Sequence, residues 1–160
     1  MTDLGAWLKP DEGLRAALDA KDRRAIQAPR DYFTALPDSA AAQAEALQVI
    51  ADHLCSHFPD TYFRMGPQID IIPAFRRLRL DDPLTPPLLI AAGLVAEDLI
   101  LLQKDADHWQ VIASAAISVP AQLPDLTEAS LDRQVLFHSG RHILCKLPES
   151  GAVLMTVRAS

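Results

Sequence analysis

Residues 94–120 constrain the fold more than any other part of this chain. In this segment, LVAEDLILLQKDADHWQVIASAAISVP, the acids Glu97 and Asp98 close an apolar stretch, and two apolar runs follow. Short apolar runs bounded by polar turn residues are typical of buried strands. We therefore expect a buried helix over residues 83–96, a strand over 99–103, a tight polar turn over 104–108 and a returning strand over 109–119.

The C-terminal part of the chain has the pattern of further antiparallel strands. Residues 135–138, 141–147 and 152–158 are rich in strand-forming residues, and they are separated by Ser139-Gly140 and by residues 148–151, which suit hairpin turns. Together with the two strands above, the sequence predicts about five antiparallel strands.

Helices are predicted in the N-terminal part. Leu14, Ala17, Leu18 and Lys21 continue one helical face through residue 26, and Pro29 stops it. A second helix is capped by Asp38 or Ser39, and its apolar residues recur at helical spacing: Ala42, Leu47, Ile50, Leu54 and Phe58. Helices followed by antiparallel strands indicate an α+β fold, which at 160 residues we expect to form a single domain over residues 1–160.

Two connecting segments lack a clear period. Residues 59–87 are rich in proline, and we interpret them as an irregular crossing segment with one short strand near residues 69–72. Residues 120–132 form a second connection, either a loop or one turn of helix capped by Thr127.

Composition excludes several classes of function. The net charge is −6, and the arginine clusters at residues 23–24 and 76–79 are too short for a stripe that binds nucleic acid. The longest apolar run, residues 88–96, cannot cross a bilayer, we expect no signal peptide, and the two cysteines have no CxxC spacing. We expect a cytoplasmic protein without a membrane partner. GxSxG, GxGxxG and P-loop motifs are absent from the sequence, and a homodimer through the sheet remains open.

The predicted hairpins place one histidine on an apolar face. A two-residue turn at Ser139-Gly140 pairs Phe137 with His142, and the next hairpin puts His142 opposite Val157 and Leu144 opposite Met155. The resulting face carries Val135, Phe137, His142, Leu144, Met155 and Val157. An imidazole among apolar and thioether groups can be the axial ligand of a haem iron. The alternative is a core or rim histidine that is hydrogen-bonded to a carbonyl. Arg141, beside His142, completes the candidate cofactor-binding set.

Other ionisable residues carry weaker patterns. His138 lies beside a turn, and His53 and His57 share a helix face, but HExxH is absent, so zinc is not indicated. Negative charge at the C-terminal end of a helix is unfavourable, which suggests a partner for Glu97 or Asp98, such as Arg133 or Arg141. A small amine would need a carboxylate or an aromatic cage, for which the candidates are Glu97, Asp98, Trp109 and Tyr62.

Two blocks of the sequence resemble the haem-dependent oxidative N-demethylase α-subunit family. One block is LVAEDLILL followed by WQVIASA and Val119-Pro120, and the other is RHILCKLPESGAV at residues 141–153. The resemblance implies a PAS-like α/β domain that binds haem b and, with reductase or other demethylase subunits, oxidatively removes a methyl group from a secondary amine.

The chain departs from the family pattern after Pro120. Leu123 stands where the family has tryptophan, Ala121 replaces a serine, and a histidine-containing segment that should follow is missing. Two hypotheses follow from this. The first is a compact haem-dependent N-demethylase-like protein, which binds haem and acts on or senses a small amine. The alternative is a non-catalytic PAS-like binding or assembly module that has lost the cofactor site, so whether the chain is an enzyme stays open.

Overall fold

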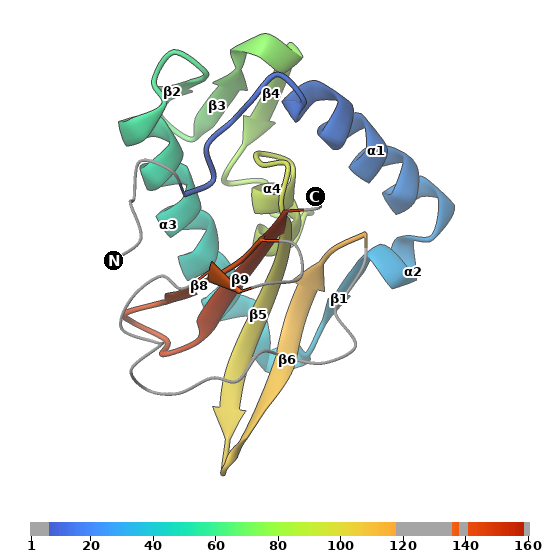
Figure 1. Cartoon of the computed structure of the whole chain (residues 1–160), viewed down its shortest axis with the longest axis vertical. Helices are drawn as coiled ribbons and strands as arrows, with labels where there is room; N and C mark the ends of the chain where they lie inside the picture. The colour runs from blue at the N-terminus through green and yellow to red at the C-terminus, as the bar shows by residue number, and fades with distance from the viewer. Residues whose placement is uncertain (1–6, 118–135, 138–140, 159–160) are drawn as a thin grey trace.

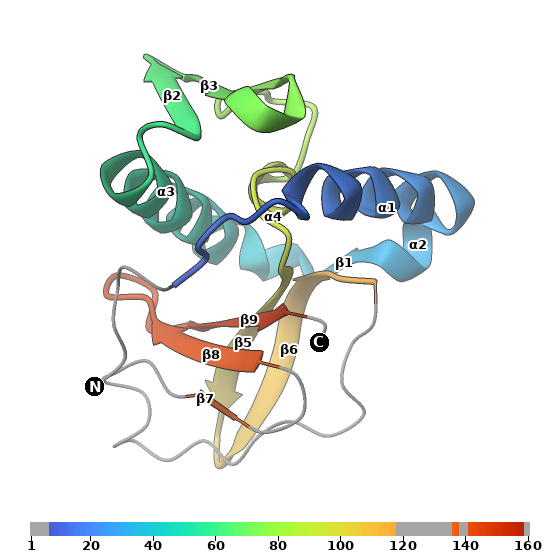
Figure 2. The ribbon, with the colours of Figure 1, turned by 45° about the horizontal axis from the view of Figure 1, so that its top comes forward.

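The computed structural model describes residues 7–117, 136–137 and 141–158 of the chain. Within these residues the strands form a six-stranded antiparallel sheet, in the order β1-β6-β5-β9-β8-β7, and a separate three-stranded sheet, in the order β2-β3-β4. Figure 2 shows the labelled α-helices on one side of the six-stranded sheet. The fold is therefore mixed α+β, as the sequence predicts.

The six-stranded sheet contains the five predicted strands and one more. The five are β5 (Asp98–Asp105), β6 (His108–Ala115), β7 (Leu136–Phe137), β8 (Arg141–Lys146) and β9 (Val153–Arg158). The additional strand is β1 (Phe33–Ala35), which pairs with the end of β6 through Phe33 and Ala115. Three residues give too short a pattern to be recognised as a strand, and only the tertiary pairing defines it.

Both N-terminal helices are confirmed. They are α1 (Leu14–Gln27) and α3 (Ala40–His57), with the short α2 (Pro29–Tyr32) and the 3₁₀ turn η2 (Pro37–Ser39) between them. The predicted side-chain cap of α3 is wrong in its chemistry. Ser39 occupies the N-cap position, but its hydroxyl donates to the carbonyl oxygen of Leu36 at 2.7 Å and accepts from Gln43 Nε2 at 3.0 Å.

The proline-rich segment is more regular than predicted, because it contains a complete small sheet. Its strands are β2 (Tyr62–Met65), β3 (Gln68–Ile71) and β4 (Arg76–Arg79), with the 3₁₀ turn η3 (Ile72–Ala74) before β4. The prolines do not interrupt the ladder, since Pro67 lies in the turn between β2 and β3 and Pro73 lies in η3. Proline outside the paired positions is compatible with a sheet.

The predicted helix over residues 83–96 is also wrong in its extent. The observed α4 (Pro87–Ala92) is much shorter. At the start, Pro86 is extended, with φ −56° and ψ 140°, because a residue before proline is pushed out of the helical region. At the end, the chain leaves the helix at Gly93, and a lysine side chain binds the carbonyl group of Ala92 and two that follow, as described below.

The turn between β5 and β6 is tighter than predicted. The two strands pair as far as Asp105 and His108, which leaves only Ala106 and Asp107 in the turn, and Ala106 has a φ of 55°. The predicted polar residues 104 and 105 therefore belong to the ladder. β6 ends at Ala115, and residues 118–119 of the predicted strand lie outside the described residues, as do residues 120–132.

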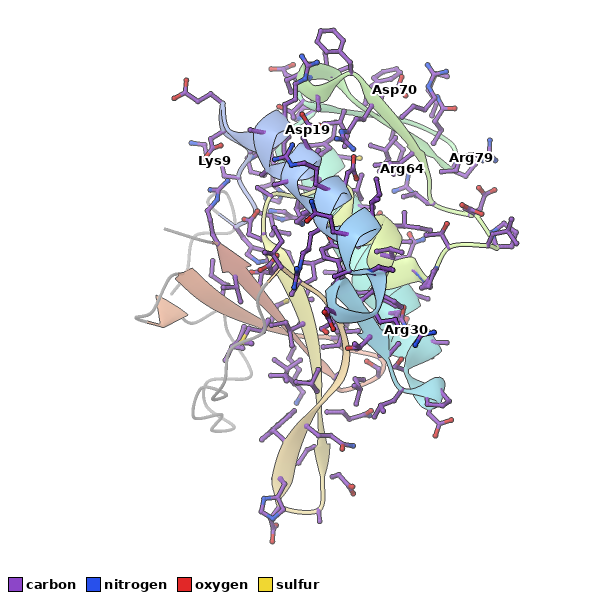
Figure 3. The ribbon with its side chains drawn as sticks, turned by 90° about the vertical axis from the view of Figure 1, so that its right-hand side faces the viewer. Lys9, Asp19, Arg30, Arg64, Asp70 and Arg79 are labelled. Atoms are coloured by element: carbon purple, nitrogen blue, oxygen red, sulfur yellow. The ribbon has the colours of Figure 1, made fainter. Side chains whose placement is uncertain are left out.

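The small sheet is joined to α1 by ion pairs. Arg76 of β4 lies 2.5 Å from Asp19 and 2.8 Å from Asp22, both on α1. In Figure 3, Asp19 lies on α1 close to the small sheet, which carries Asp70 and Arg79. Within the part of the chain that the structure describes, no helix is both long and apolar enough to span a membrane.

Candidate functional site

The face of the six-stranded sheet turned away from the helices carries its own apolar cluster, which we call the far-face cluster. Ile100 of β5, Met155 of β9 and Leu144 of β8 are ladder neighbours across three adjacent strands. The full cluster is Ile100, Leu102, Ala116, Leu144, Val153 and Met155, with Trp109, Val111 and Val157 packed against it. Alternate residues of the same strands, such as Leu101 and Leu154, belong to the core beneath the helices. The sheet is thus apolar on both faces.

The predicted pairing of the candidate site residues is found in the ladder. Phe137 pairs with His142, His142 pairs with Val157, and Leu144 pairs with Met155. Leu144 and Met155 are fully buried members of the far-face cluster. The fifth candidate, Arg141, pairs with Arg158 at the end of the sheet. The side chains of Phe137, Arg141 and His142 lie outside the described part, as do Val135 and His138, so the ligand role of His142 stays a prediction.

A buried lysine is the main polar feature on the other face of the sheet. Lys21 of α1 is 4% exposed, and its Nζ donates to the carbonyl oxygens of Ala92 at 2.9 Å, Val95 at 2.7 Å and Glu97 at 2.5 Å. An ammonium group has three N–H donors, so each donor has a partner. Burial lowers the pKa of Lys21 to about 8, although the nearby carboxylates of Asp98 and Glu97 oppose the shift.

Glu97 and Asp98 differ in their surroundings. Glu97 is buried, and burial raises its pKa, against the opposing effects of Arg158 and Lys21. Asp98 is partly exposed, and its Oδ1 accepts a hydrogen bond from the backbone N–H of Ile117 at 3.1 Å. The predicted partners Arg133 and Arg141 have side chains outside the described part. Within that part, the cations near Glu97 are Arg158 and Lys21.

The residues considered for amine recognition do not gather in one place. Tyr62 is buried, and its hydroxyl donates to the carbonyl oxygen of Leu94 at 2.6 Å. Burial raises its pKa, with a further contribution from Glu97. Trp109 instead packs on the far-face cluster and pairs with Lys104 near the β5–β6 turn. Tyr62 and Glu97 are thus core groups near one another, and Trp109 belongs to the opposite face of the sheet.

The histidines of α3 are engaged with one another and with the backbone. The rings of His53 and His57 stack with centroids 4.3 Å apart. His53 Nε2 donates to the carbonyl oxygen of Trp7 at 2.6 Å, and His57 Nδ1 donates to that of His53 at 3.1 Å. Among the described residues, no group of three or more histidine, cysteine, aspartate or glutamate side chains could hold a metal ion.

The sequence contains a signal that Lys21 is buried, namely its position on the apolar face of α1. The sequence prediction treats Lys21 only as one of the residues that continue a helical face. Lys21 follows Leu14, Ala17 and Leu18 at spacings that keep it on the apolar face of α1. A lysine on the buried face of a helix needs acceptors, since an unpaired buried charge is very costly. The acceptors themselves, carbonyl groups 71 to 76 residues away, have no sequence signature.

Comparison with known proteins places the chain in a family. A family profile described as "haem-dependent oxidative N-demethylase, alpha subunit-like" matches residues 1–125. The match includes α1, α3, the small sheet and the β5–β6 hairpin, and it ends before β8 and β9. No curated protein matches the chain. Because the profile covers well over half of the sequence, the chain belongs to the haem-dependent oxidative N-demethylase alpha subunit-like family.

Proposed function

We propose that this chain is a compact haem-binding member of its family, which holds haem b against the far face of the six-stranded sheet. The observation that carries the proposal is the ladder position of His142, between Phe137 on β7 and Val157 on β9. Alternation along β8 assigns position 142 to the same face as Leu144. His142 is then the iron ligand.

The chemistry of the far-face cluster suits a flat, apolar macrocycle. Leu144, Met155 and Val157 are aliphatic and thioether side chains, and none of them carries a charge. Such a wall excludes water and supports a histidine-ligated haem. Phe137 is an apolar residue type, and Arg141 is a cation that would complement the negative charge of haem propionates. The residue types at these five positions therefore fit haem by their chemistry.

The activity proposed for this site is oxidation or sensing of a small amine. When bound, haem supplies the redox chemistry needed to oxidise an N-methyl group. The chain's own contribution is to orient the haem and to keep water from it. The family description names an alpha subunit, so a reductase or further demethylase subunits are the proposed partners, and a homodimer is a further possibility for assembly.

The second candidate is a non-catalytic binding or assembly module. Two observations favour it, the first being that Ile100, Leu102, Leu144, Val153 and Met155 all have zero exposure, so the far face is closely packed. The family match also stops at residue 125, before the strands that carry the candidate ligand. If side chains fill the space that a cofactor would occupy, the protein keeps the family fold but loses the cofactor chemistry.

An absorption spectrum of the protein, purified after expression with haem supplied, separates the two candidates. The haem-binding proposal expects a Soret band at a haem-to-protein ratio near one, and a spectral change when a secondary amine such as dimethylamine is added. A band without the amine-induced change would support haem binding and contradict the amine proposal. A colourless protein that takes up no haem in a direct titration would overturn the first candidate and favour the second.

A further inference from the structure

Residues 7–11 form a segment that we call the strap. It crosses from α1 towards α3 on the helical side of the sheet, as the dark blue trace in Figure 1 shows. The side chains of Trp7 and Leu8 are each 2% exposed. The strap is thus a part of the core, although it has no regular secondary structure.

The strap is attached by side chains from two elements. His53 of α3 donates from Nε2 to the carbonyl oxygen of Trp7 at 2.6 Å, and its ring lies 4.7 Å from the Trp7 ring. On β9, Thr156 Oγ1 accepts from Trp7 Nε1 at 3.4 Å, and Arg158 donates to the carbonyl oxygen of Lys9 at 3.2 Å. Between these attachments, Leu8 has a φ of 55°. The left-handed region is unfavourable for leucine, so the attachments hold a strained backbone in place.

The hydrogen bonds of the two stacked histidines fix their proton positions. Carbonyl oxygens only accept, so the neutral His53 ring carries its one proton on Nε2 and the neutral His57 ring carries its proton on Nδ1. A second proton on the buried His53 would have to go to Nδ1, in a ring that stacks on the ring of His57.

Among the described residues, no carboxylate is one of the groups that shift the pKa of His53. Burial lowers the pKa of His53, the hydrogen bond to Trp7 opposes that shift, and His57 lowers the pKa further. The charged groups on the elements around the pair are engaged with each other: Asp52 of α3 with Arg64 of β2, and Asp11 of the strap with Arg158 of β9. Lys9 of the strap adds positive charge.

We propose that the strap is an acid-released clasp, which the buried His53, stacked on His57, holds closed while the His53 ring is neutral. With the strap in place, His53 is 8% exposed and its second proton is disfavoured. Lifting the strap brings water to His53, so the open form binds one proton more than the closed form. The ratio of open to closed forms then rises as the pH falls through the open-form pKa of about 6.5, by at most about tenfold for each pH unit. Release would uncover Thr156 and the end of β9, and it would relax Leu8.

The fluorescence of Trp7 tests the clasp. The chain has two tryptophans, so Trp109→Phe leaves Trp7 alone, and acrylamide quenching reports its access to solvent. We expect quenching to rise several-fold, reversibly, between pH 7.5 and pH 5, with an unchanged far-UV circular dichroism spectrum. His53→Gln keeps a neutral donor for the Trp7 carbonyl and should abolish the rise. His108→Gln, at the exposed start of β6, is the matched control and should retain it.

Three results would overturn the proposal. They are an absence of any rise, an equal rise in His53→Gln, or a rise that coincides with loss of the far-UV signal, which indicates global unfolding. If Trp109→Phe does not fold, hydrogen exchange of residues 7–11 in the otherwise unchanged chain, corrected for intrinsic rates, provides the same comparison between parent, His53→Gln and His108→Gln. None of these readouts requires haem, so they stand apart from the proposed function.

Discussion

The Nζ atom of Lys21 lies 2.5 Å from the carbonyl oxygen of Glu97 and so joins the first helix to the start of the central strand β5. The same Nζ binds the carbonyl groups of Ala92 and Val95, where α4 ends. One side chain thereby satisfies the carbonyl group of the last residue of α4 and two more in the segment between α4 and β5. The Glu-Asp pair at residues 97–98 follows directly, in the region that the family profile matches.

Replacing this lysine should destabilise the fold strongly. Lys21→Met keeps the apolar part of the side chain but leaves three carbonyl groups without their donor. Buried groups that lose a partner cost about 1–3 kcal/mol each, with partial relaxation, so we expect a loss of about 3 kcal/mol in the free energy of unfolding, measured by urea denaturation. Lys104→Met, on the exposed end of β5, is the control and should change stability by less than about 0.5 kcal/mol. Equal effects of the two substitutions would contradict the role of Lys21.

The same lysine should give stability a pH dependence in the alkaline range. Its pKa falls from 10.5 to about 8 on folding, so between these values the unfolded chain binds more protons than the folded chain. The free energy of unfolding should therefore rise with pH in this window, by up to about 1.4 kcal/mol per unit. Tyr32 and Tyr62, whose pKa values burial raises, act in the opposite direction at higher pH. The difference between the parent and Lys21→Met from pH 7 to 9.5 isolates the lysine, and a flat difference would refute the prediction.

Glu45 should hold the β8–β9 hairpin against α3. Its carboxylate accepts from the backbone N–H groups of Glu149 at 2.6 Å and Ser150 at 2.9 Å. Burial raises the pKa of Glu45, but these bonds outweigh burial and lower it overall. Its contribution is therefore present above the unfolded pKa of about 4.5 and is lost as the pH falls through the lower folded value.

Glu45→Ala should cost about 1 kcal/mol at pH 7, since the site is partly open to solvent. It should also speed hydrogen exchange at Glu149 and Ser150. Glu12→Ala, at an exposed position before α1, is the control. Unchanged exchange at both hairpin amides in Glu45→Ala would show that the contact does not restrain the turn.

Phe75 offers a substitution that should stabilise the protein. Its φ is 54° and its side chain is 83% exposed, with the Arg15 guanidinium 5.4 Å from the ring centre. The left-handed conformation costs about 1 kcal/mol for a residue with a side chain, but asparagine tolerates it. Phe75→Asn should raise the free energy of unfolding by about 0.5 kcal/mol, after loss of the weak exposed cation–π contact. A decrease, seen in the same urea assay, would show that the aromatic contact is worth more than the strain.

The sequence predicts the parts of this fold in which pattern and packing agree. The 3.6-residue period of Leu14 to Lys21 and the apolar run around Ile100 correspond to α1 and β5 in the structure, and the hairpin register at Phe137, His142 and Met155 follows from turn length alone. The small sheet is missed because its prolines fall in turns rather than in the ladder. The short α4 and the strand β1 depend on tertiary partners, Lys21 for the former and β6 for the latter. Such long-range partners leave no local pattern.

The candidate site, like the fold, can be predicted from the sequence only in part. The apolar face with Leu144 and Met155 can be predicted from alternation, whereas the dense packing of Ile100 and Leu102 onto that face requires the full set of strands. The polar centre at Lys21 and the attachment of Trp7 to His53 join segments 46 to 76 residues apart. Their sequence neighbours give no reason to pair them.

Titration of the protein with haem, in the parent and in two histidine variants, tests the proposed site most directly. We expect a saturable Soret band in the parent that is lost in His142→Ala and retained in His108→Ala, whose histidine lies at the exposed start of β6. The parent and His142→Ala should have the same far-UV circular dichroism spectrum, so that loss of the band reports loss of the ligand. A band of equal strength in His142→Ala would contradict haem ligation at the ladder position between Phe137 and Val157.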